Sequence, residues 1–473
     1  MSLHINHHRH CMTRPRPDDG DHPPGKRTRP GEKPRAGTCA FADRVASCAI
    51  DAYARAKATT NASSPLRTVL AAFVAHDEET DALRCVSLGV GTKTRGREKD
   101  DDDGTRIVDA HAEVLARRGL KRFLLRETRE RTSASASALA SPSAFLEVDE
   151  ETDSGRGTAR AVMRVRPGVS LHLYVSSAPC GNATVRRWAK GRATKRRDDL
   201  GDSGVPREPH EKLQRSALDA GQVALCVKVI KSSKDEETPE ELRRMIDRGE
   251  LAPGTAPVKG VAGKEALTCS DKLCVWNVVG YQGALVGRFL RDPLYVDTIT
   301  IGRKFSEPHL CRAMCCRVDG FVSACGGYAT RHPALMETRV AFDKVPMDAV
   351  EGAVFENPFA MTWSAGDEAA EVLDGKTGWF LSQVEETGSS PAVCKARLFR
   401  DFNATAGNDD APFTREAYDE AKRNARPTYD DAKTQLFRDW KMFAPRAGYP
   451  GWDAQKSKRW SGYVRDVRRA RID

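Results

Sequence analysis

Two short motifs, a His-x-Glu and a Pro-Cys, constrain the fold of this chain more than any other feature. His111 and Glu113 form the first motif, and Pro179-Cys180 forms the second, far downstream. Histidine nitrogen and cysteine thiolate are ligands that zinc prefers in proteins. A glutamate beside such a metal can move protons without binding the metal itself. The fold must therefore bring two distant segments to one point.

The residues around each motif predict how the two motifs could meet. Residues 171–176 alternate and include aromatic and β-branched side chains, which is typical of a strand that ends just before Cys180. Apolar residues of 111–125 recur at helical spacing, so we expect a helix with His111 and Glu113 in its first turn. A second helix is expected after Cys180, where the helix dipole would favour the thiolate. Further strands are expected at 69–72, 83–89 and 223–230, which predicts an α/β core.

A catalytic zinc needs a third protein ligand, and the chain offers several cysteines for that role. Cys269 is the best placed, because a helix is expected to begin directly after it. Cys226 lies in an apolar run, where a cysteine usually belongs to the core. The other candidates are Cys274 and the four cysteines between Cys311 and Cys325. A single histidine or cysteine is more often structural, so the prediction depends on the three occurring together in order.

Three separated blocks now carry a resemblance to a known family: Asp109–Val114 with Arg117 and Arg118, Pro179–Gly181, and Cys269–Lys272 followed by Trp276–Leu285. They closely resemble the adenosine-to-inosine RNA deaminase domain, which tRNA-specific adenosine deaminases share with double-stranded-RNA editing deaminases. The resemblance implies a cytidine-deaminase-like α/β/α core with a mixed sheet. It implies zinc on His111, Cys180 and Cys269, with Glu113 as the proton shuttle and Asp109 in support. It also places residues near an extruded nucleotide: Val69, Thr92 and Lys93.

The C-terminal part repeats a Tyr-x-x-x-Lys pattern, in Tyr418/Lys422 and Tyr429/Lys433. At helical spacing, each pair shares one face, which by itself fits a surface stripe with snorkelling lysines. The family resemblance implies instead that a helical C-terminal portion encloses inositol hexakisphosphate. Val275 and Val108 depart from the family pattern around this cofactor. The implied contacts are Arg117, Arg118, Lys272, Gly283, Lys395, Tyr418, Lys422, Tyr429, Lys433 and Trp452.

Composition indicates a polyanionic partner and a reducing compartment. The net charge is +10, and Arg186–Arg197 is a basic segment that could follow an RNA path or form a solvated loop. The 13 cysteines are unevenly spaced, and the N-terminus lacks a secretory signal, so we expect a cytoplasmic or nuclear protein. The sequence contains no run of about eighteen apolar residues, so we expect no membrane span.

We expect a disordered N-terminal tail over 1–37 and one deaminase domain over 38–473. Inserted loops are expected around 94–106, 130–168, 190–220 and 232–257, where charge, Ser/Ala runs and Pro/Gly replace any apolar pattern. The short tail favours the tRNA-specific branch, which deaminates the adenosine 3′ of the anticodon. A double-stranded-RNA (mRNA) adenosine deaminase and a non-catalytic RNA-binding relative are the alternatives.

Overall fold

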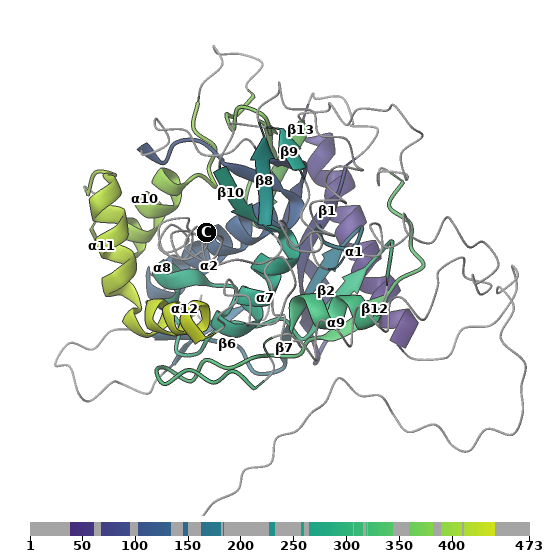
Figure 1. The fold of residues 1–473 in the computed structure, drawn as a ribbon, viewed down its shortest axis with the longest axis horizontal. Coiled ribbons are helices and arrows are strands. Elements are labelled where there is room, and N and C mark those ends of the chain that lie inside the picture. The colour runs from purple at the N-terminus through teal and green to yellow at the C-terminus, as the bar shows by residue number, and fades with distance from the viewer. Residues whose placement is uncertain are drawn as a thin grey trace, which may run out of the picture.

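A mixed sheet with helices on both faces forms the centre of the computed structural model (Figure 1). The structure describes residues 38–60, 68–94, 103–133, 145–149, 162–180, 183, 227–231, 257–259, 264–305, 307–315, 318, 320–343, 359–381, 389–408 and 411–439. The expected tail over 1–37, the basic segment Arg186–Arg197 and the helix expected after Cys180 lie outside these residues.

The central sheet has seven strands in the order β12-β11-β7-β1-β2-β13-β14. Strands β7, β11 and β12 are parallel, and the remaining neighbours pair antiparallel. The strands predicted at 171–176, 69–72 and 83–89 are confirmed as β7, β1 and β2, so the fold is a mixed α/β structure. The bounds are β12 Ala334–Glu337, β11 Thr298–Ile301, β7 Val169–Val175, β1 Leu70–Asp77, β2 Ala82–Val90, β13 Phe359–Ser364 and β14 Glu371–Asp374.

Alternation along the strands separates two hydrophobic clusters, one on each face of the sheet. Leu70, Ala72 and Val74 of β1 pack with helix α1 (Thr38–Ala58) on one face. Phe73 points to the other face, where the cluster contains apolar side chains of α2 (Ala112–Ser133) and α7 (Cys269–Val279). Because successive side chains of a strand point to opposite faces, one strand supports both layers.

Helix α2 lies unusually close to the sheet. A Cβ atom added at Gly89 would lie 2.5 Å from the backbone oxygen of Ala112 and the nitrogen of Ala116. The Ser87 hydroxyl donates a hydrogen bond of 3.0 Å to the Ala116 carbonyl. The helix begins at Ala112, one residue later than expected, because His111 ends the short strand β4 (Asp109–His111), which pairs with β3 (Thr92–Thr94). The depth and start of α2 are therefore fixed by backbone contacts.

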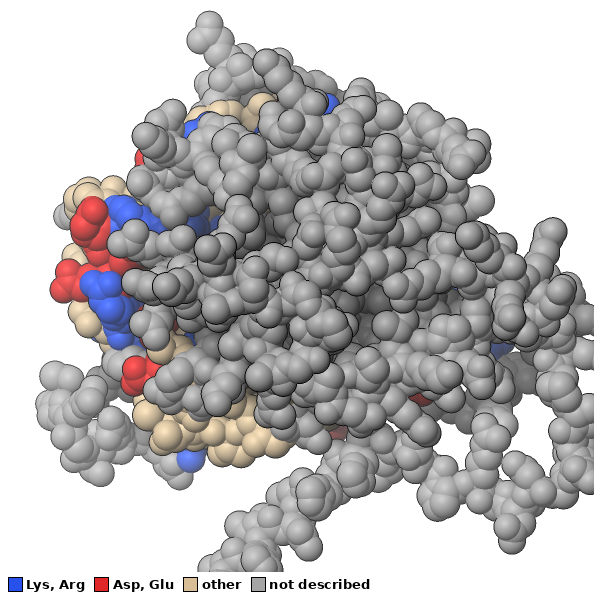
Figure 2. Space-filling model, viewed as in Figure 1, with Lys and Arg blue, Asp and Glu red and all other residues tan. Residues whose placement is uncertain are grey.

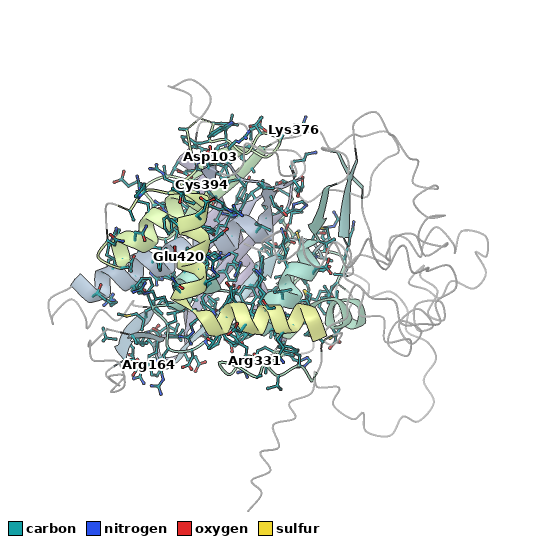
Figure 3. All side chains as sticks on the ribbon, turned by 60° about the vertical axis from the view of Figure 1, so that its left-hand side comes forward. Asp103, Arg164, Arg331, Lys376, Cys394 and Glu420 are labelled. Atoms are coloured by element: carbon teal, nitrogen blue, oxygen red, sulfur yellow. The ribbon has the colours of Figure 1, made fainter. Side chains whose placement is uncertain are left out.

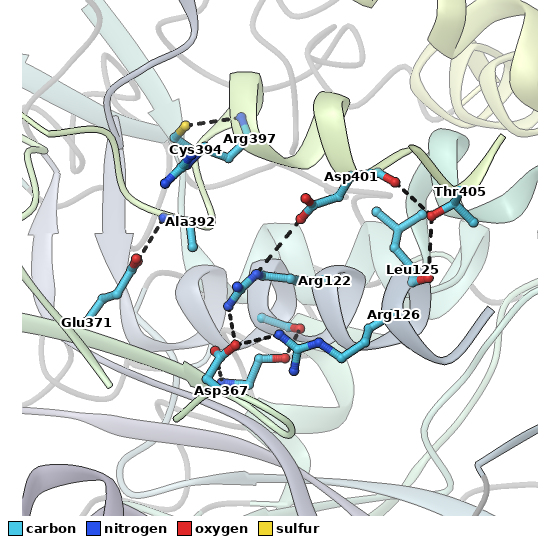
Figure 4. Close-up of polar contacts among 12 residues, drawn as sticks. Arg122, Leu125, Arg126, Asp367, Glu371, Ala392, Cys394, Arg397, Asp401 and Thr405 are labelled. Carbon is cyan, nitrogen blue, oxygen red and sulfur yellow. Dashed lines mark hydrogen bonds and ion pairs between the residues drawn. The ribbon is translucent and has the colours of Figure 1, made fainter. Parts of the chain in front are cut away.

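Ion pairs connect the second half of α2 to its neighbours (Figure 4). Arg122 and Arg126 both pair with Asp367, which follows β13. Arg122 also lies 3.9 Å from the Asp401 carboxylate of α10 (Lys395–Thr405). The helix that carries Glu113 is thus tied to the sheet edge and to the C-terminal helices.

The remaining elements surround this core. The stretch 130–168, expected as an inserted loop, contains the end of α2 and the paired strands β5 (Leu146–Asp149) and β6 (Val162–Val165). Of the strand expected at 223–230, the structure describes the end as β8 (Val227–Lys231), which joins β9 (Pro257–Lys259) and β10 (Lys264–Leu267). The other helices are α8 Gly283–Gly287, α9 Glu307–Met314, α11 Arg415–Ala425 and α12 Pro427–Asp439.

Helices α11 and α12 pack against α8, on the side of the molecule away from α9 and β12 in Figure 1. In the described part of the chain, none of the helices combines the length and the apolar character that crossing a membrane requires.

Candidate active site

The three predicted ligands meet at one edge of the sheet. His111 ends β4, Cys180 follows β7, and Cys269 is the first residue of α7. One ligand atom from each lies within 4.8 Å of the other two, and this is the one such group of three in the described residues. Cys274, considered as an alternative, lies fully buried on α7 and is not part of the group.

Backbone contacts hold the two cysteines together. The Cys269 amide donates to the Cys180 sulfur at 3.4 Å, and the Ser270 amide donates to the Cys180 carbonyl at 3.1 Å. A capping box formed by Thr268 and Asp271 fixes where α7 starts. Both sulfurs therefore lie at a helix N-terminus, where backbone N–H groups stabilise thiolates.

The Glu113 carboxylate lies beside this group in the first turn of α2. Its side chain is buried, and the Cys269 side chain forms a hydrogen bond with it. Burial raises the pKa of the Glu113 carboxyl and the neighbouring Cys180 raises it further, while His111 lowers it. A carboxyl whose pKa is raised can accept and release a proton near neutral pH.

A chain of polar contacts holds the His111 ring. The Asp109 carboxylate lies 2.6 Å from His111 Nδ1 and also accepts the His111 backbone amide at 3.0 Å. The other Asp109 oxygen accepts a hydrogen bond from the Lys272 ammonium at 2.5 Å. The Thr94 hydroxyl lies 3.0 Å from the same ring nitrogen. Sequence reasoning missed Thr94, because a threonine at a strand end carries no ligand motif.

The donor set fits zinc. One imidazole and two thiols leave a fourth tetrahedral position open, as in catalytic rather than structural zinc sites. The carboxylate contact to the ring of His111 is the arrangement that commonly orients a zinc-bound histidine. Ala183, which stands where a second nearby cysteine would complete a Pro-Cys-x-x-Cys turn, is buried and offers no ligand.

The residues expected near the substrate lie at the same edge. Thr92 pairs with His111 across the β3–β4 ladder, and Lys93 pairs with Ala110. The Val69 carbonyl accepts the amide of Gly91, directly before β3. Thr92 and Lys93 therefore lie next to the segment that carries the His-x-Glu motif, and Val69 lies next to the residue that precedes β3.

A second group of functional candidates is buried beside α2, and we call it the cationic pocket. Tyr418, Lys422 and Tyr429 line one pocket together with Gly283 and Lys121. Arg117 belongs to it as well, because a Cβ atom added at Gly283 would meet the Lys121 side chain at 3.0 Å and the Arg117 guanidinium at 3.4 Å.

Two neighbouring arginines of α2 are held by backbone oxygens and an aromatic ring. Arg117 is 1% exposed, donates to the Tyr281 carbonyl at 2.8 Å and stacks over Trp276 at 4.5 Å. Arg118 donates to the Val393 carbonyl at 2.9 Å. Lys121 and Trp276 had no assigned role from sequence, since a lysine on a long helix usually faces solvent.

The other predicted contacts are placed as follows. Lys395 is the first residue of α10 and Lys433 lies on α12, both partly buried, while Trp452 lies outside the described residues. The surface-stripe interpretation is wrong for Tyr418, Lys422 and Tyr429, which are buried.

The outer surface of α11 differs from its buried side. It mixes both signs of charge (Figure 2), and Glu420 lies on its exposed side (Figure 3). On the buried side of this helix the charged residue is Lys422.

Comparison with known proteins agrees with this geometry. The chain matches the adenosine-deaminase (editase) domain over residues 87–454. Rat double-stranded RNA-specific editase B2 is 27% identical over 79% of this chain and 44% of its own length. Mouse double-stranded RNA-specific adenosine deaminase is 27% identical over 86% of this chain and 31% of its own length. Mouse tRNA-specific adenosine deaminase 1 is 26% identical over 69% of this chain and 78% of its own length.

This chain thus spans less than half of the length of the two double-stranded-RNA relatives. The family match covers most of the chain and includes all three blocks that carried the resemblance. The chain belongs to the adenosine-deaminase (editase) domain family.

Proposed function

We propose that this protein converts adenosine to inosine in tRNA, at the position 3′ of the anticodon, by zinc-dependent hydrolytic deamination. The observation that carries the proposal is the group of His111, Cys180 and Cys269, with ligand atoms within 4.8 Å of one another and Glu113 beside them. These residues would hold zinc, which when bound lowers the pKa of a coordinated water and so provides hydroxide at neutral pH.

Glu113 would move the protons of the reaction. Its carboxylate takes a proton from the attacking water and passes it to the adenine ring. It then takes the proton of the new C6 hydroxyl and passes it to the departing amine. Water and adenosine thereby give inosine and ammonia. The proposal is supported by the burial of Glu113, which keeps bulk water from competing for its proton, and by its fixed place in the first turn of α2.

Asp109 and Lys272 would orient His111 rather than react. Asp109 contacts the ring and the backbone amide of His111, and Lys272 fixes the Asp109 carboxylate from the other side. Ligand orientation by such partners commonly changes metal affinity by 10- to 100-fold, on the order of 1.4–2.7 kcal/mol.

We also propose that the cationic pocket holds inositol hexakisphosphate. Two buried donors, Arg118 Nε and Trp276 Nε1, have no acceptor among the described residues. Gly283, at φ 72°, leaves open the space between Lys121 and Arg117 that a side chain would fill. A polyphosphate would neutralise cations that could not otherwise be buried together without loss of stability. Lys395, Lys433 and Trp452 would complete the contacts.

The choice of tRNA is supported by the mouse tRNA-specific relative, of which the matched region makes up 78%. That deaminase therefore consists largely of the domain that this chain contains. A double-stranded-RNA substrate is the second candidate, because the double-stranded RNA-specific relatives are equally similar, at 27% identity.

The test is to incubate the purified protein with bulk tRNA and with a long RNA duplex, and to map inosine by sequencing. We expect inosine next to the anticodon with the wild type and none with Glu113→Gln. Product confined to the duplex would select the second candidate. Wild-type protein that retains zinc but forms no inosine in either RNA would reject both.

A further inference from the structure

The turn that follows β11 lies against the segment that leads to Cys180. Strands β7 and β11 are parallel neighbours, with Ile301 opposite Val175, so both end at the same edge of the sheet. The Gly302 amide donates to the Val175 carbonyl, and the Ala178 amide donates to the Arg303 carbonyl, each at 2.9 Å. Ala178 precedes Cys180 by two residues, which span at most about 7 Å.

The backbone of this turn is tightly defined. A Cβ atom at Gly302 would approach the Ser176 carbonyl oxygen to 2.8 Å, so a side chain there would displace the turn. Lys304 adopts a left-handed backbone with φ 60°. Residues other than glycine keep such a conformation at a cost of about 1 kcal/mol, which indicates that its surroundings impose it. Phe305 then packs against the core. Arg303 and Lys304 are partly exposed cations on a rigid support.

A third cation lies at the same edge of the sheet as this turn. Lys93 joins Arg303 and Lys304 at the edge that carries the metal ligands, since its strand pairs with β4. These three cations lie beside the metal ligands, and cations gathered at one site attract a polyanion.

We propose that the Gly302–Lys304 turn binds backbone phosphate of the RNA beside the adenosine that is deaminated. The inference rests on the proposed function and adds a positioning site to it. Because the Ala178 hydrogen bond fixes the turn relative to Cys180, a phosphate held by Arg303 and Lys304 determines how far the neighbouring nucleotide reaches toward the metal ligands. Phosphate contacts position a nucleic acid without reading its sequence, so the turn acts on all substrates alike.

The test compares a double variant, Arg303→Gln with Lys304→Gln, against a matched double variant, Arg423→Gln with Lys376→Gln, at two exposed positions elsewhere. Binding of fluorescently labelled bulk tRNA is measured over a salt series in the Glu113→Gln background, so that the result does not depend on turnover. We expect the turn variant to bind tenfold or more weakly at low salt. The slope of log affinity against log salt should fall by about 1 for each phosphate that the turn no longer neutralises. The control variant should retain the wild-type slope.

Two further variants separate phosphate binding from a structural role. Arg303→Lys with Lys304→Arg keeps both charges and should restore most of the affinity. Lys304→Gly relieves the backbone strain, so it should keep or raise the melting temperature while it weakens tRNA binding. A wild-type salt slope in the glutamine variant would overturn the proposal, whatever its melting temperature. Absence of inosine with normal binding by the wild type would instead reject the proposed function alone.

Discussion

The metal-ligand group and the cationic pocket both lie along α2, but their buried charges differ. In the metal-ligand group, His111 and Glu113 lie at the start of α2. The charges of Asp109 and Lys272 balance each other, with the carboxylate oxygen 2.5 Å from the ammonium nitrogen. At the second, Lys121 and Lys422 line one pocket, and the buried Arg117 guanidinium lies beside Gly283, which also lines it. Side chains of the protein balance the charges of the first group, whereas the proposed inositol hexakisphosphate would neutralise the cations of the second.

The largest effect is expected at Glu113. Glu113→Gln keeps the shape of the side chain but removes proton transfer, so turnover should fall by about 10²- to 10⁴-fold. Bound zinc, measured by elemental analysis, should stay near one equivalent, because the side chain is not a proposed ligand. The exposed Glu416→Gln on α11 serves as the control. Substantial turnover by Glu113→Gln would remove this residue from the mechanism.

The next effect concerns two cysteines of one helix. Cys269→Ala should lose zinc and all activity, because it removes one of three ligands. Cys274→Ala, five positions further along and equally buried, should keep its zinc and lose only about 1 kcal/mol of stability. Elemental analysis measures the zinc content of each variant, and denaturant unfolding measures its stability. Zinc retained by the first variant and lost by the second would move the ligand to Cys274.

Replacing Lys422 tests whether the cationic pocket holds an anion, because the sign of the change in the free energy of unfolding differs between the two cases. If the pocket holds a polyanion, Lys422→Met should lower the free energy of unfolding by about 3 kcal/mol. If it holds none, replacing a buried cation by an apolar side chain of similar length should be neutral or stabilising. Arg423→Met, at the exposed neighbouring position, should change stability by less than about 0.5 kcal/mol. Mass spectrometry of the denatured protein identifies any released phosphate compound.

A smaller effect is expected at Thr94. Thr94→Val removes the hydroxyl beside His111 Nδ1 with little change in volume, so zinc affinity should fall by about tenfold. Thr94→Ser should retain the wild-type affinity, since it keeps the hydroxyl. Competition with a chromogenic chelator measures both. Equal affinities for the two variants would mean that Thr94 only fills space.

The metal-ligand group could be predicted from sequence because its residues stand at the ends of regular elements. His111 ends β4, Cys269 begins α7, and Cys180 lies in the segment that follows β7, so ligand type and local pattern coincide. The mixed α/β fold followed from the alternation of the same elements. The exact start of α2 did not, because the pairing of β4 with β3 is a tertiary contact that extends the strand through His111.

The cationic pocket was less accessible from the residues alone. Arg117 and Lys422 follow no pattern that separates them from a solvated helix face, and only the family resemblance pointed to their burial. Lys121 was missed for the same reason. Likewise, β5 and β6 are short, follow a Ser/Ala-rich run and are separated by a charged stretch, so no sequence periodicity predicted their pairing.

The hydrogen bond between Cys180 and Cys269 joins positions 89 residues apart along the chain. An unfolded polypeptide would rarely bring such distant thiols together, because closing a long loop is entropically unfavourable. Retention of the proposed zinc would therefore report on the integrity of the central sheet and the helices beside it. The rate of zinc release into a chelator should equal the rate at which this part of the protein opens, and so should measure that motion in the native state.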